Sequence, residues 1–227
     1  MSILVVDVGT SGLRAAIVRD DATVDHVQYR PLPPATPFPG LVEFDASAMA
    51  AHVLEVATAA LAAGGPVHAV GIANQRASTV VWDRATGEPI GPGIGWQDLR
   101  TVFDCLTLAG EGVRVAPNQS VTKVMWLLNA FDPERGRDLC FGTVDTWIAW
   151  TLSGGALHVT DPSNAALTGM LRGDASGWHG EVCATANVPT AMLPSIVDST
   201  GAIGEASALP GAPPIAGIIG DQQGSLI

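Results

Sequence analysis

The first eighteen residues hold the feature that most constrains the fold, an apolar run that stops abruptly at a carboxylate. The run Ile3–Val6 is typical of a buried strand, and it ends at Asp7. A loop of small and hydroxylated residues follows from Gly9 to Gly12, and after Arg14 the chain is apolar again. We therefore expect a hairpin of residues 3–8 and 14–18. Because a strand and not a helix follows the glycine loop, the segment is neither a P-loop nor a Rossmann dinucleotide motif.

The rest of the chain alternates between strand-like and helix-like segments. Asp45 and Asp145 are each expected to cap a helix, and the proline-rich residues 31–39 are expected to form an extended loop. The other expected strands are 24–29, 67–72, 78–83, 90–96, 141–144 and 214–219, and the expected helices are 46–63, 98–108, 122–131 and 145–152. This order predicts an α/β fold with a mixed sheet flanked by helices.

Composition and charge exclude several classes of protein. With 227 residues, 47% apolar and 15% charged, the chain is expected to fold as one large domain or two small ones. No apolar run approaches the ~20 residues of a membrane helix, and the amino terminus has no basic start, so we expect a cytoplasmic protein with no membrane partner. A net charge of −11 without a basic patch argues against nucleic acid. The three scattered cysteines predict buried, reduced thiols and neither a disulfide framework nor a zinc site.

The glycine loop and Asp7 are suited to binding a phosphate and a metal ion. Small loop residues can present backbone N–H groups and hydroxyls to an anion, and Arg14 can reach the same anion. A carboxylate beside an apolar sheet is costly without a partner, and hydrated Mg²⁺ would supply one for Asp7. In the alternative interpretation, Asp7 caps an ordinary hairpin turn by accepting hydrogen bonds from loop amides. This segment alone does not choose between the two.

A second carboxylate ends a strand near the end of the chain. The apolar residues 215–219 are followed by Gly220 and Asp221. A kinase that phosphorylates a hydroxyl needs a carboxylate to take the proton, and Asp221 suits that role. Between the two carboxylates, Arg76 and Trp96 each follow an expected strand, and such a pair can bind the hydroxyls and C–H faces of a polyol. Taken alone, Trp96 is also typical of a core residue.

Seven stretches of the sequence together resemble the FGGY carbohydrate kinases, and the glycerol kinases among them most closely. They are residues 7–11, 71–76, 95–101, 122–126, 142–147, 159–161 with 164–165, and 217–223. Seven stretches in order do not plausibly arise by chance. The resemblance implies an actin-like ATPase (ribonuclease H-like) fold, with ATP and Mg²⁺ in a cleft between two such domains. It implies that residues 1–217 form the first domain and that 218–227 begin a truncated second one.

The resemblance also implies roles for individual residues. Asp7 would serve the metal, and Asp221 would be the general base. The ATP phosphates would contact Thr10, Ser11, Gly12 and Arg14, and the hydroxylated acceptor would contact Gln75, Arg76, Trp96, Asp221 and Gln222. Two positions that would also touch the acceptor depart from the glycerol kinases. They are Ala77, where an acidic residue is expected, and Asn118, where an aromatic residue is expected.

These two departures indicate an acceptor different from or larger than glycerol, although glycerol remains a candidate. An Ala at position 77 removes a charge-assisted hydrogen bond worth ~1.5–3 kcal/mol and enlarges the pocket. We therefore expect an ATP-dependent kinase for a small polyol or sugar, active in a full-length form and assembled as a homo-oligomer. We expect this chain alone to turn over little or no ATP.

Two alternatives remain beside the kinase interpretation. The first is a non-catalytic sugar-binding or regulatory module of the same fold, which the presence of both Asp7 and Asp221 opposes. The second is another actin-like ATPase, such as a chaperone or a filament former. The stretches 74–76 and 95–97 oppose it, because those proteins have no sugar pocket to build.

Overall fold

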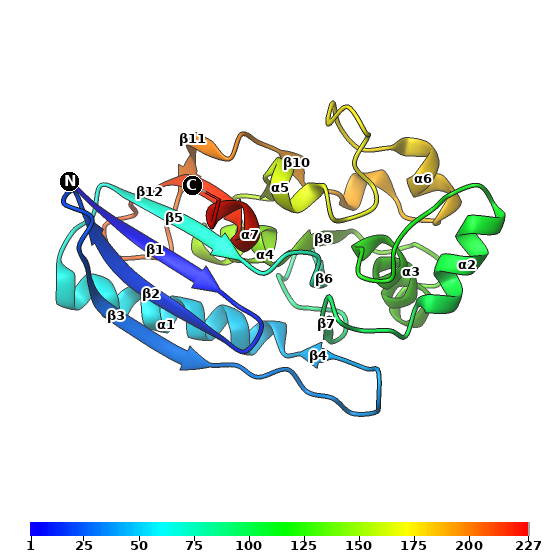
Figure 1. Cartoon of the computed structure of the whole chain (residues 1–227), viewed down its shortest axis with the longest axis horizontal. Coiled ribbons are helices and arrows are strands. Elements are labelled where there is room, and N and C mark those ends of the chain that lie inside the picture. Colours follow the sequence, from blue (N-terminus) through cyan, green and yellow to red (C-terminus); the bar gives the residue numbers. More distant parts are fainter. Residues whose placement is uncertain (227) are drawn as a thin grey trace.

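The computed structural model describes residues 1–226, which form two main sheets with helices packed around them (Figure 1). The larger sheet has six strands in the order β11-β12-β5-β1-β2-β3. Its strands are β1 (Ser2–Val8), β2 (Gly12–Arg19), β3 (Val24–Pro31), β5 (Ala69–Asn74), β11 (Thr200–Glu205) and β12 (Pro214–Gly220). Strand β5 pairs in parallel with both β1 and β12, whereas the other neighbours are antiparallel. The sheet is therefore mixed, as the sequence predicts.

The smaller sheet has four strands in the order β4-β7-β6-β8. They are β4 (Glu43–Phe44), β6 (Thr79–Asp83), β7 (Gly93–Ile94) and β8 (Leu139–Thr143), and a separate parallel pair is formed by β9 (Val159–Thr160) and β10 (Ser195–Ile196). The helices are α1 (Ala46–Gly64), α2 (Val102–Gly110), α3 (Ser120–Phe131), α4 (Val144–Leu152), α5 (Pro162–Ala165), α6 (Gly180–Thr185), the 3₁₀ turn η1 (Thr190–Met192) and α7 (Asp221–Gly224).

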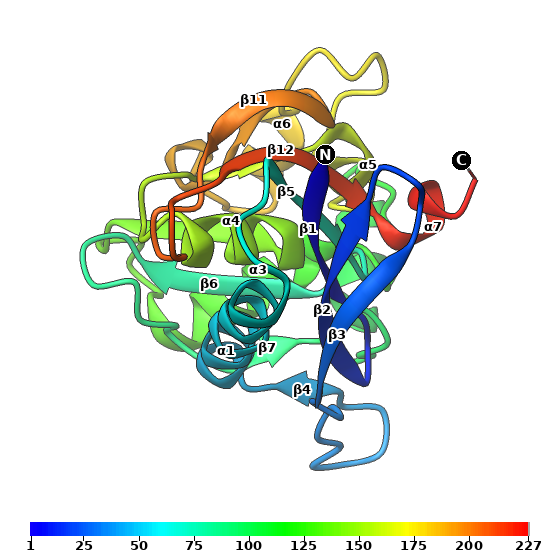
Figure 2. The ribbon, with the colours of Figure 1, turned by 90° about the vertical axis from the view of Figure 1, so that its left-hand side faces the viewer.

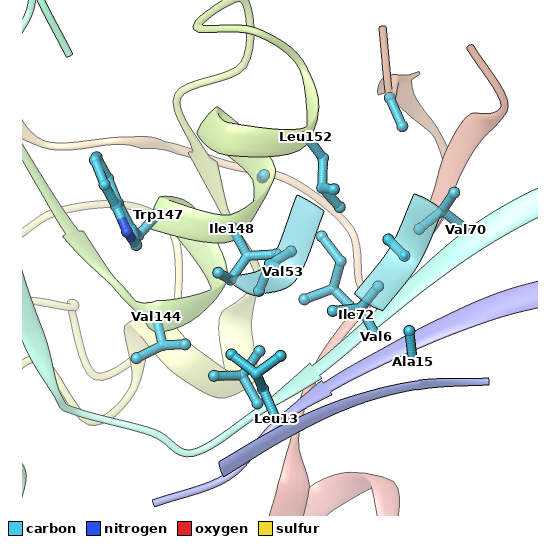
Figure 3. Close-up of a cluster of buried hydrophobic side chains, with 14 of the residues drawn as sticks. Val6, Leu13, Ala15, Val53, Val70, Ile72, Val144, Trp147, Ile148 and Leu152 are labelled. Atoms are coloured by element: carbon cyan, nitrogen blue, oxygen red, sulfur yellow. The ribbon is translucent and has the colours of Figure 1, made fainter. Parts of the chain in front are cut away.

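Helices α1 and α4 cover one face of the large sheet and form the main core with it. Alternate residues of β1 are fully buried, including Leu4 and Val6, as expected for a strand with one face against a core. Figure 3 shows Val6 and Ile72 from the sheet pointing toward Val53 of α1 and Ile148 of α4. Figure 2 shows α1 nearly end-on beside β1 to β3. This packing fixes the parallel strands β1, β5 and β12 relative to one another.

Most of the expected elements are present, and one expected cap is wrong. The carboxylate of Asp45 caps α1 by accepting a hydrogen bond from the N–H of Ala48 at 2.9 Å, as predicted. Asp145 does not cap α4, because the helix begins one residue earlier and Thr143 occupies the N-cap position. Asp145 is instead fully buried inside the first turn, where its side chain accepts hydrogen bonds from the hydroxyls of Thr143 and Thr160. The expected hairpin of residues 78–83 and 90–96 is present only in part, because β7 is two residues long.

The length and apolar composition of helix α1 differ from the sequence expectation, which was that no apolar run approaches the length of a membrane span. It has 19 residues, and its most apolar window has a mean hydropathy of 1.4, so its length and composition alone would allow it to cross a membrane. Its apolar stripe, which includes Met49, Val53 and Ala57, is buried against the sheet. It therefore has the packing of a core helix.

The predicted division between two domains falls inside strand β12. Residues 214–220 pair with β5 and belong to the same sheet as β1. The division at residues 217 and 218 itself stays a prediction. The three cysteines are buried and unpaired, as expected.

Candidate active site

Three parallel strands end side by side at one edge of the large sheet. Val8 at the end of β1 and Gly220 at the end of β12 are both in register with Asn74 at the end of β5. The loops that follow these strands therefore begin at the same edge, although they are far apart in the sequence. This is the edge at which open α/β sheets bind ligands.

A cavity of about 290 Å³ lies at this edge. Its lining includes all seven residues predicted to contact the acceptor. The full lining is Thr10, Gln75, Arg76, Ala77, Trp96, Asn118, Leu167, Asp221 and Gln222. Thr10 was predicted for the phosphates, and Leu167 was not predicted at all. Asp7, Ser11, Gly12 and Arg14 do not line the cavity, and they lie on the adjoining hairpin of β1 and β2.

Arg76 connects two walls of the cavity. Its Nη1 lies 3.4 Å from the carbonyl oxygen of Ser163, and its Nη2 donates a hydrogen bond to the side-chain oxygen of Gln222. Its Nε is buried and has no hydrogen-bond partner within residues 1–226. A buried donor without a partner costs free energy, so the site is polar and incompletely satisfied at this point.

Trp96 lies at the surface of the cavity and is not a core residue. Its side chain is 38% exposed, which rules out the core interpretation that the sequence left open. Its indole N–H donates to the hydroxyl of Thr10 at 3.3 Å, and its backbone N–H donates to the hydroxyl of Ser78 at 3.1 Å. The ring is thus fixed next to the glycine loop and presents an aromatic surface to the cavity.

A buried ion pair supports the loop that carries Trp96. The guanidinium of Arg100 donates to Asp98 at 2.9 Å and to Glu43 at 2.7 Å, and it lies 4.5 Å over the ring of Trp126. Burial alone would raise the pKa of Asp98, but hydrogen bonds from Arg100 and from the N–H of Val42 outweigh burial and lower that pKa. Asp98 is therefore held as a charged anchor for the loop.

Asp7 lies where its strand ends, and it pairs with Arg14 on the neighbouring strand. Arg14 Nε lies 3.2 Å from Asp7 Oδ2. Burial raises the pKa of Asp7, the charge of Arg14 opposes this rise, and the charge of Asp221 adds to it. The two carboxylates therefore lie within each other's electrostatic field. Asp7 accepts no hydrogen bond from the loop amides of residues 9–12 in the described chain, so the alternative role as a turn cap is not observed.

Asp7 and Asp221 fit a hydrated magnesium ion but not a closed metal cage. Within residues 1–226, no group of three or more His, Cys, Asp or Glu side chains could hold a metal. Mg²⁺ is commonly held by one or two carboxylates together with water and phosphate oxygens. The mutual repulsion of the two carboxylates is a charge arrangement that such a cation would relieve.

The glycine loop keeps free backbone donors. The N–H of Gly9 donates across the loop to the carbonyl of Gly12 at 3.0 Å, whereas the N–H groups of Thr10 and Ser11 make no hydrogen bond within residues 1–226. A Cβ on Gly12 would lie 2.8 Å from the carbonyl oxygen of Arg30 and 2.5 Å from the hydroxyl of Tyr29. Glycine is therefore required at position 12 by close packing against β3.

A polar network that was not predicted from the sequence joins α5 to β12. The buried carboxylate of Asp161 accepts hydrogen bonds from the hydroxyls of Ser163 at 2.9 Å and Ser199 at 2.7 Å. The hydroxyl oxygen of Ser163 in turn accepts a hydrogen bond from the N–H of Gly220 at 2.8 Å. Ser163 lies between the stretches 159–161 and 164–165, which was the only signal for it. Leu167 follows the second of these stretches and carried no chemical signal.

Comparison with known proteins identifies the same family as the sequence motifs. Residues 2–227 match the FGGY family of carbohydrate kinases, N-terminal domain. The chain is 40% identical to the glycerol kinase of Trichlorobacter lovleyi over an alignment that covers 99% of this chain and 49% of that protein. It is also 40% identical to the glycerol kinase of Thermus brockianus, covering 99% of this chain and 50% of the relative. The chain thus spans about half the length of these relatives.

Solved structures show the same fold at lower sequence identity. The glycerol kinase of Plasmodium falciparum, solved with ADP, superposes with a TM-score of 0.89 at 22% identity, covering 98% of this chain and 49% of that one. The xylulose kinase of Rhodospirillum rubrum superposes with a TM-score of 0.86 at 21% identity, covering 100% of this chain and 50% of that one. The predicted actin-like ATPase fold is therefore confirmed.

Proposed function

The chain belongs to the FGGY family of carbohydrate kinases, and from this premise we propose that it forms the acceptor and phosphate side of an ATP-dependent kinase for a small polyol or sugar. The observation that carries the proposal is the cavity of about 290 Å³ at the strand ends. It gathers a carboxylate, Asp221, a guanidinium, Arg76, and an indole, Trp96, from three separate parts of the chain. The names of the relatives support the reaction class, since both are glycerol kinases.

In this proposal each side chain has a distinct task at the acceptor. Trp96 covers the C–H face of the acceptor, while Arg76 and Gln222 bond its hydroxyls. Asp221 accepts the proton of the attacking hydroxyl, which makes the oxygen a better nucleophile. The closely linked pair of Arg76 and Gln222 restricts the orientation of the acceptor before reaction.

The hairpin of β1 and β2 serves the phosphates. The free N–H groups of Thr10 and Ser11 and the guanidinium of Arg14 can bind phosphate oxygens, and the absence of a side chain at Gly12 keeps the loop compact. Asp7 would hold Mg²⁺ through its water shell. When bound, ATP and Mg²⁺ supply the phosphoryl group and offset its negative charge.

The acceptor is proposed to be larger than glycerol or different from it. Ala77 and Asn118 both line the cavity, which supports a contact of both departures from the glycerol kinases with the proposed acceptor. Neither position carries a carboxylate or an aromatic ring, which leaves more room and fewer charged contacts. Glycerol remains within the proposed class.

The proposal extends to the whole protein. We propose that catalysis requires a second actin-like domain, that the protein is a cytoplasmic homo-oligomer, and that this chain alone has little or no ATP turnover. A net charge of −11 supports the proposal that nucleic acid is not a partner.

The experiment that tests the function is acceptor-dependent ADP release by the longest form of the protein that contains this chain. The panel holds glycerol, erythritol, ribitol, xylitol, xylulose and ribulose. ADP release with one of them supports the kinase and names its acceptor. If no compound is phosphorylated but one still binds, the second candidate function, a regulatory sugar-binding module, accounts better for Ala77 and Asn118.

The substitution Ala77→Glu tests the acceptor preference. Ala77 already has a left-handed backbone, with φ of 64°, so another non-glycine residue imposes no new backbone requirement. We expect the variant to gain activity on glycerol by about 10- to 150-fold and to lose it on larger acceptors, since one charge-assisted bond is worth about 1.5–3 kcal/mol. Ala77→Gln is the matched uncharged control. Unchanged glycerol turnover in Ala77→Glu would contradict this part of the proposal.

A further inference from the structure

Lys123 is the only lysine of the chain and is completely buried. It lies in α3, and its side chain is among the largest that are fully enclosed. Burial lowers its pKa to about 8, although the negative charge of Asp98 opposes the shift. A buried ammonium is costly, and an apolar side chain would fill the same space without that cost. The ammonium therefore needs a role that an apolar residue could not perform.

The ammonium donates hydrogen bonds to the backbone on both sides of Asn118, a residue of the cavity lining. Lys123 Nζ donates hydrogen bonds to the carbonyl oxygens of Pro117 at 2.7 Å and Gln119 at 3.1 Å. The residue between these two carbonyls is Asn118, whose side chain lines the acceptor cavity. A single charged atom thus holds the carbonyl groups of the residues on either side of Asn118.

The same segment has few other restraints. The side-chain oxygen of Gln119 accepts from the N–H of Ala116 at 2.8 Å, and the N–H of Gln119 donates back to the carbonyl of Ala116 at 2.9 Å. Asn118 itself makes no hydrogen bond within residues 1–226 and is exposed. Its placement therefore depends on the turn around it and on the clamp from Lys123.

The charge of Lys123 is also linked to the loop that carries Trp96, another residue of the cavity lining. Asp98 is the anionic group that acts on Lys123, while Arg100 and Cys105 are the other titratable groups that affect it. Asp98 anchors the loop that carries Trp96. The buried charges of Lys123, Asp98 and Arg100 thus support both segments of the cavity lining, the one with Asn118 and the one with Trp96.

We propose that Lys123 is a positioning residue for acceptor recognition, which acts by holding Asn118 against a hydroxyl of the bound polyol or sugar. It does not touch the acceptor itself. This inference rests on the proposed function, and it assigns Asn118 a recognition role that depends on the Lys123 clamp.

A double-mutant cycle tests the inference. Acceptor binding is measured for the wild type, Lys123→Met, Asn118→Ala and the double variant, using the longest form of the protein and the acceptor that the panel identifies. We expect each single change to weaken acceptor binding by about tenfold, the loss of about one hydrogen bond, and the double variant to be no weaker than Asn118→Ala. Lys123→Arg, which keeps a charged donor, should restore part of the affinity.

Two controls separate positioning from a general loss of stability. Val124→Ala shortens a buried apolar side chain of the same helix and keeps the hydrogen bonds of Lys123, so it should lower the unfolding midpoint while leaving acceptor binding unchanged. In the wild type, lysine labelled with ¹³C at Cε gives a resonance for Lys123, which is the only lysine of residues 1–227 and is assigned as the signal that Lys123→Arg loses. If Lys123→Met does not fold, this resonance serves as the readout. It should shift on acceptor binding in the wild type and not in Asn118→Ala.

The outcomes distinguish this inference from the proposed function. If the wild type binds an acceptor but the effects of Lys123→Met and Asn118→Ala on binding are additive, the inference alone is overturned. The same holds if the wild type binds an acceptor and the lysine resonance does not shift. Failure of the wild type to bind any acceptor would overturn the proposed function, and the inference with it. A non-additive cycle, with a shift that Asn118→Ala removes, supports both.

Discussion

The backbone N–H of Gly220 donates a hydrogen bond to the hydroxyl oxygen of Ser163 at 2.8 Å. This bond joins α5 to the end of β12, one residue before Asp221. The carbonyl of the same serine lies 3.4 Å from Nη1 of Arg76. Ser163 thus contacts the segments that carry the proposed base and the proposed hydroxyl ligand. It links the two without facing the acceptor itself.

Replacing Ser163 tests how firmly this link holds the site. Ser163→Ala would leave the buried Gly220 N–H without a partner, so we expect the free energy of unfolding to fall by about 1–3 kcal/mol. Ser163→Thr keeps a hydroxyl and should recover part of the loss. Urea unfolding followed by circular dichroism measures the change. The matched control is Ser176→Ala, whose exposed hydroxyl bonds only Asp174, and it should change stability by less than about 0.5 kcal/mol. An equal loss in both alanine variants would contradict the structural link.

Glycine at position 12 gives a second stability prediction. Gly12→Ala places a Cβ 2.8 Å from the carbonyl oxygen of Arg30, which is backbone and cannot rotate away. We expect a loss of about 1–3 kcal/mol from overpacking. Gly71→Ala is the control, because Gly71 lies in β5 and its Cβ would meet no atom within 4 Å. Thermal unfolding of the two variants should therefore differ clearly, and equal midpoints would contradict the close packing of the loop against β3.

The buried carboxyl of Asp145 predicts a specific pH dependence of stability. Burial raises its pKa to about 6, against hydrogen bonds from Thr143 and Thr160 that lower it. The folded protein therefore keeps this proton to a higher pH than the unfolded chain. The stability contribution of Asp145 is complete below about pH 4 and is lost as the pH rises to about 6. Relative to Asp145→Asn, the wild type should lose on the order of 3 kcal/mol over this range. Urea titrations at several pH values measure the difference, and a constant difference would contradict the prediction.

Much of the fold could be predicted from local patterns. The apolar run of residues 3–6 and the apolar stripe behind Asp45 each match one element, because both patterns are set by a single neighbouring core. The parallel placement of β1, β5 and β12 was not in any local pattern. It depends on pairing between strands that are far apart in the sequence, since β5 pairs with both β1 and β12.

The errors have identifiable physical causes. Asp145 has the residue type and position of an N-cap. Because α4 begins at Val144, however, Asp145 lies in the first turn of the helix, where it is buried and accepts hydrogen bonds from the hydroxyls of Thr143 and Thr160. Strand β11 was missed because its sequence, Thr200–Glu205, has few apolar residues and lies at the edge of the sheet. Edge strands need less burial and therefore leave a weaker pattern.

The residues that line the candidate site were easier to predict from the sequence than the residues that hold them in place. Arg76, Trp96 and Asp221 have chemistry that is rare at strand ends, so each was visible in the sequence. Ser163 acts through the N–H of Gly220, which is far away in the sequence, and Lys123 acts through the nearby carbonyls of Pro117 and Gln119. The residue types alone show neither contact.

The most direct test of the central claim is acceptor-dependent ADP release by the longest form of the protein, compared between the wild type and Asp221→Asn. The account predicts that the acceptor found in the panel is turned over by the wild type, and that the variant loses about 10²-fold or more in kcat, because the general base is gone. Its acceptor binding should change little, because the other cavity residues remain. Equal kcat in the two proteins would contradict the assignment of Asp221 as the base at this cavity.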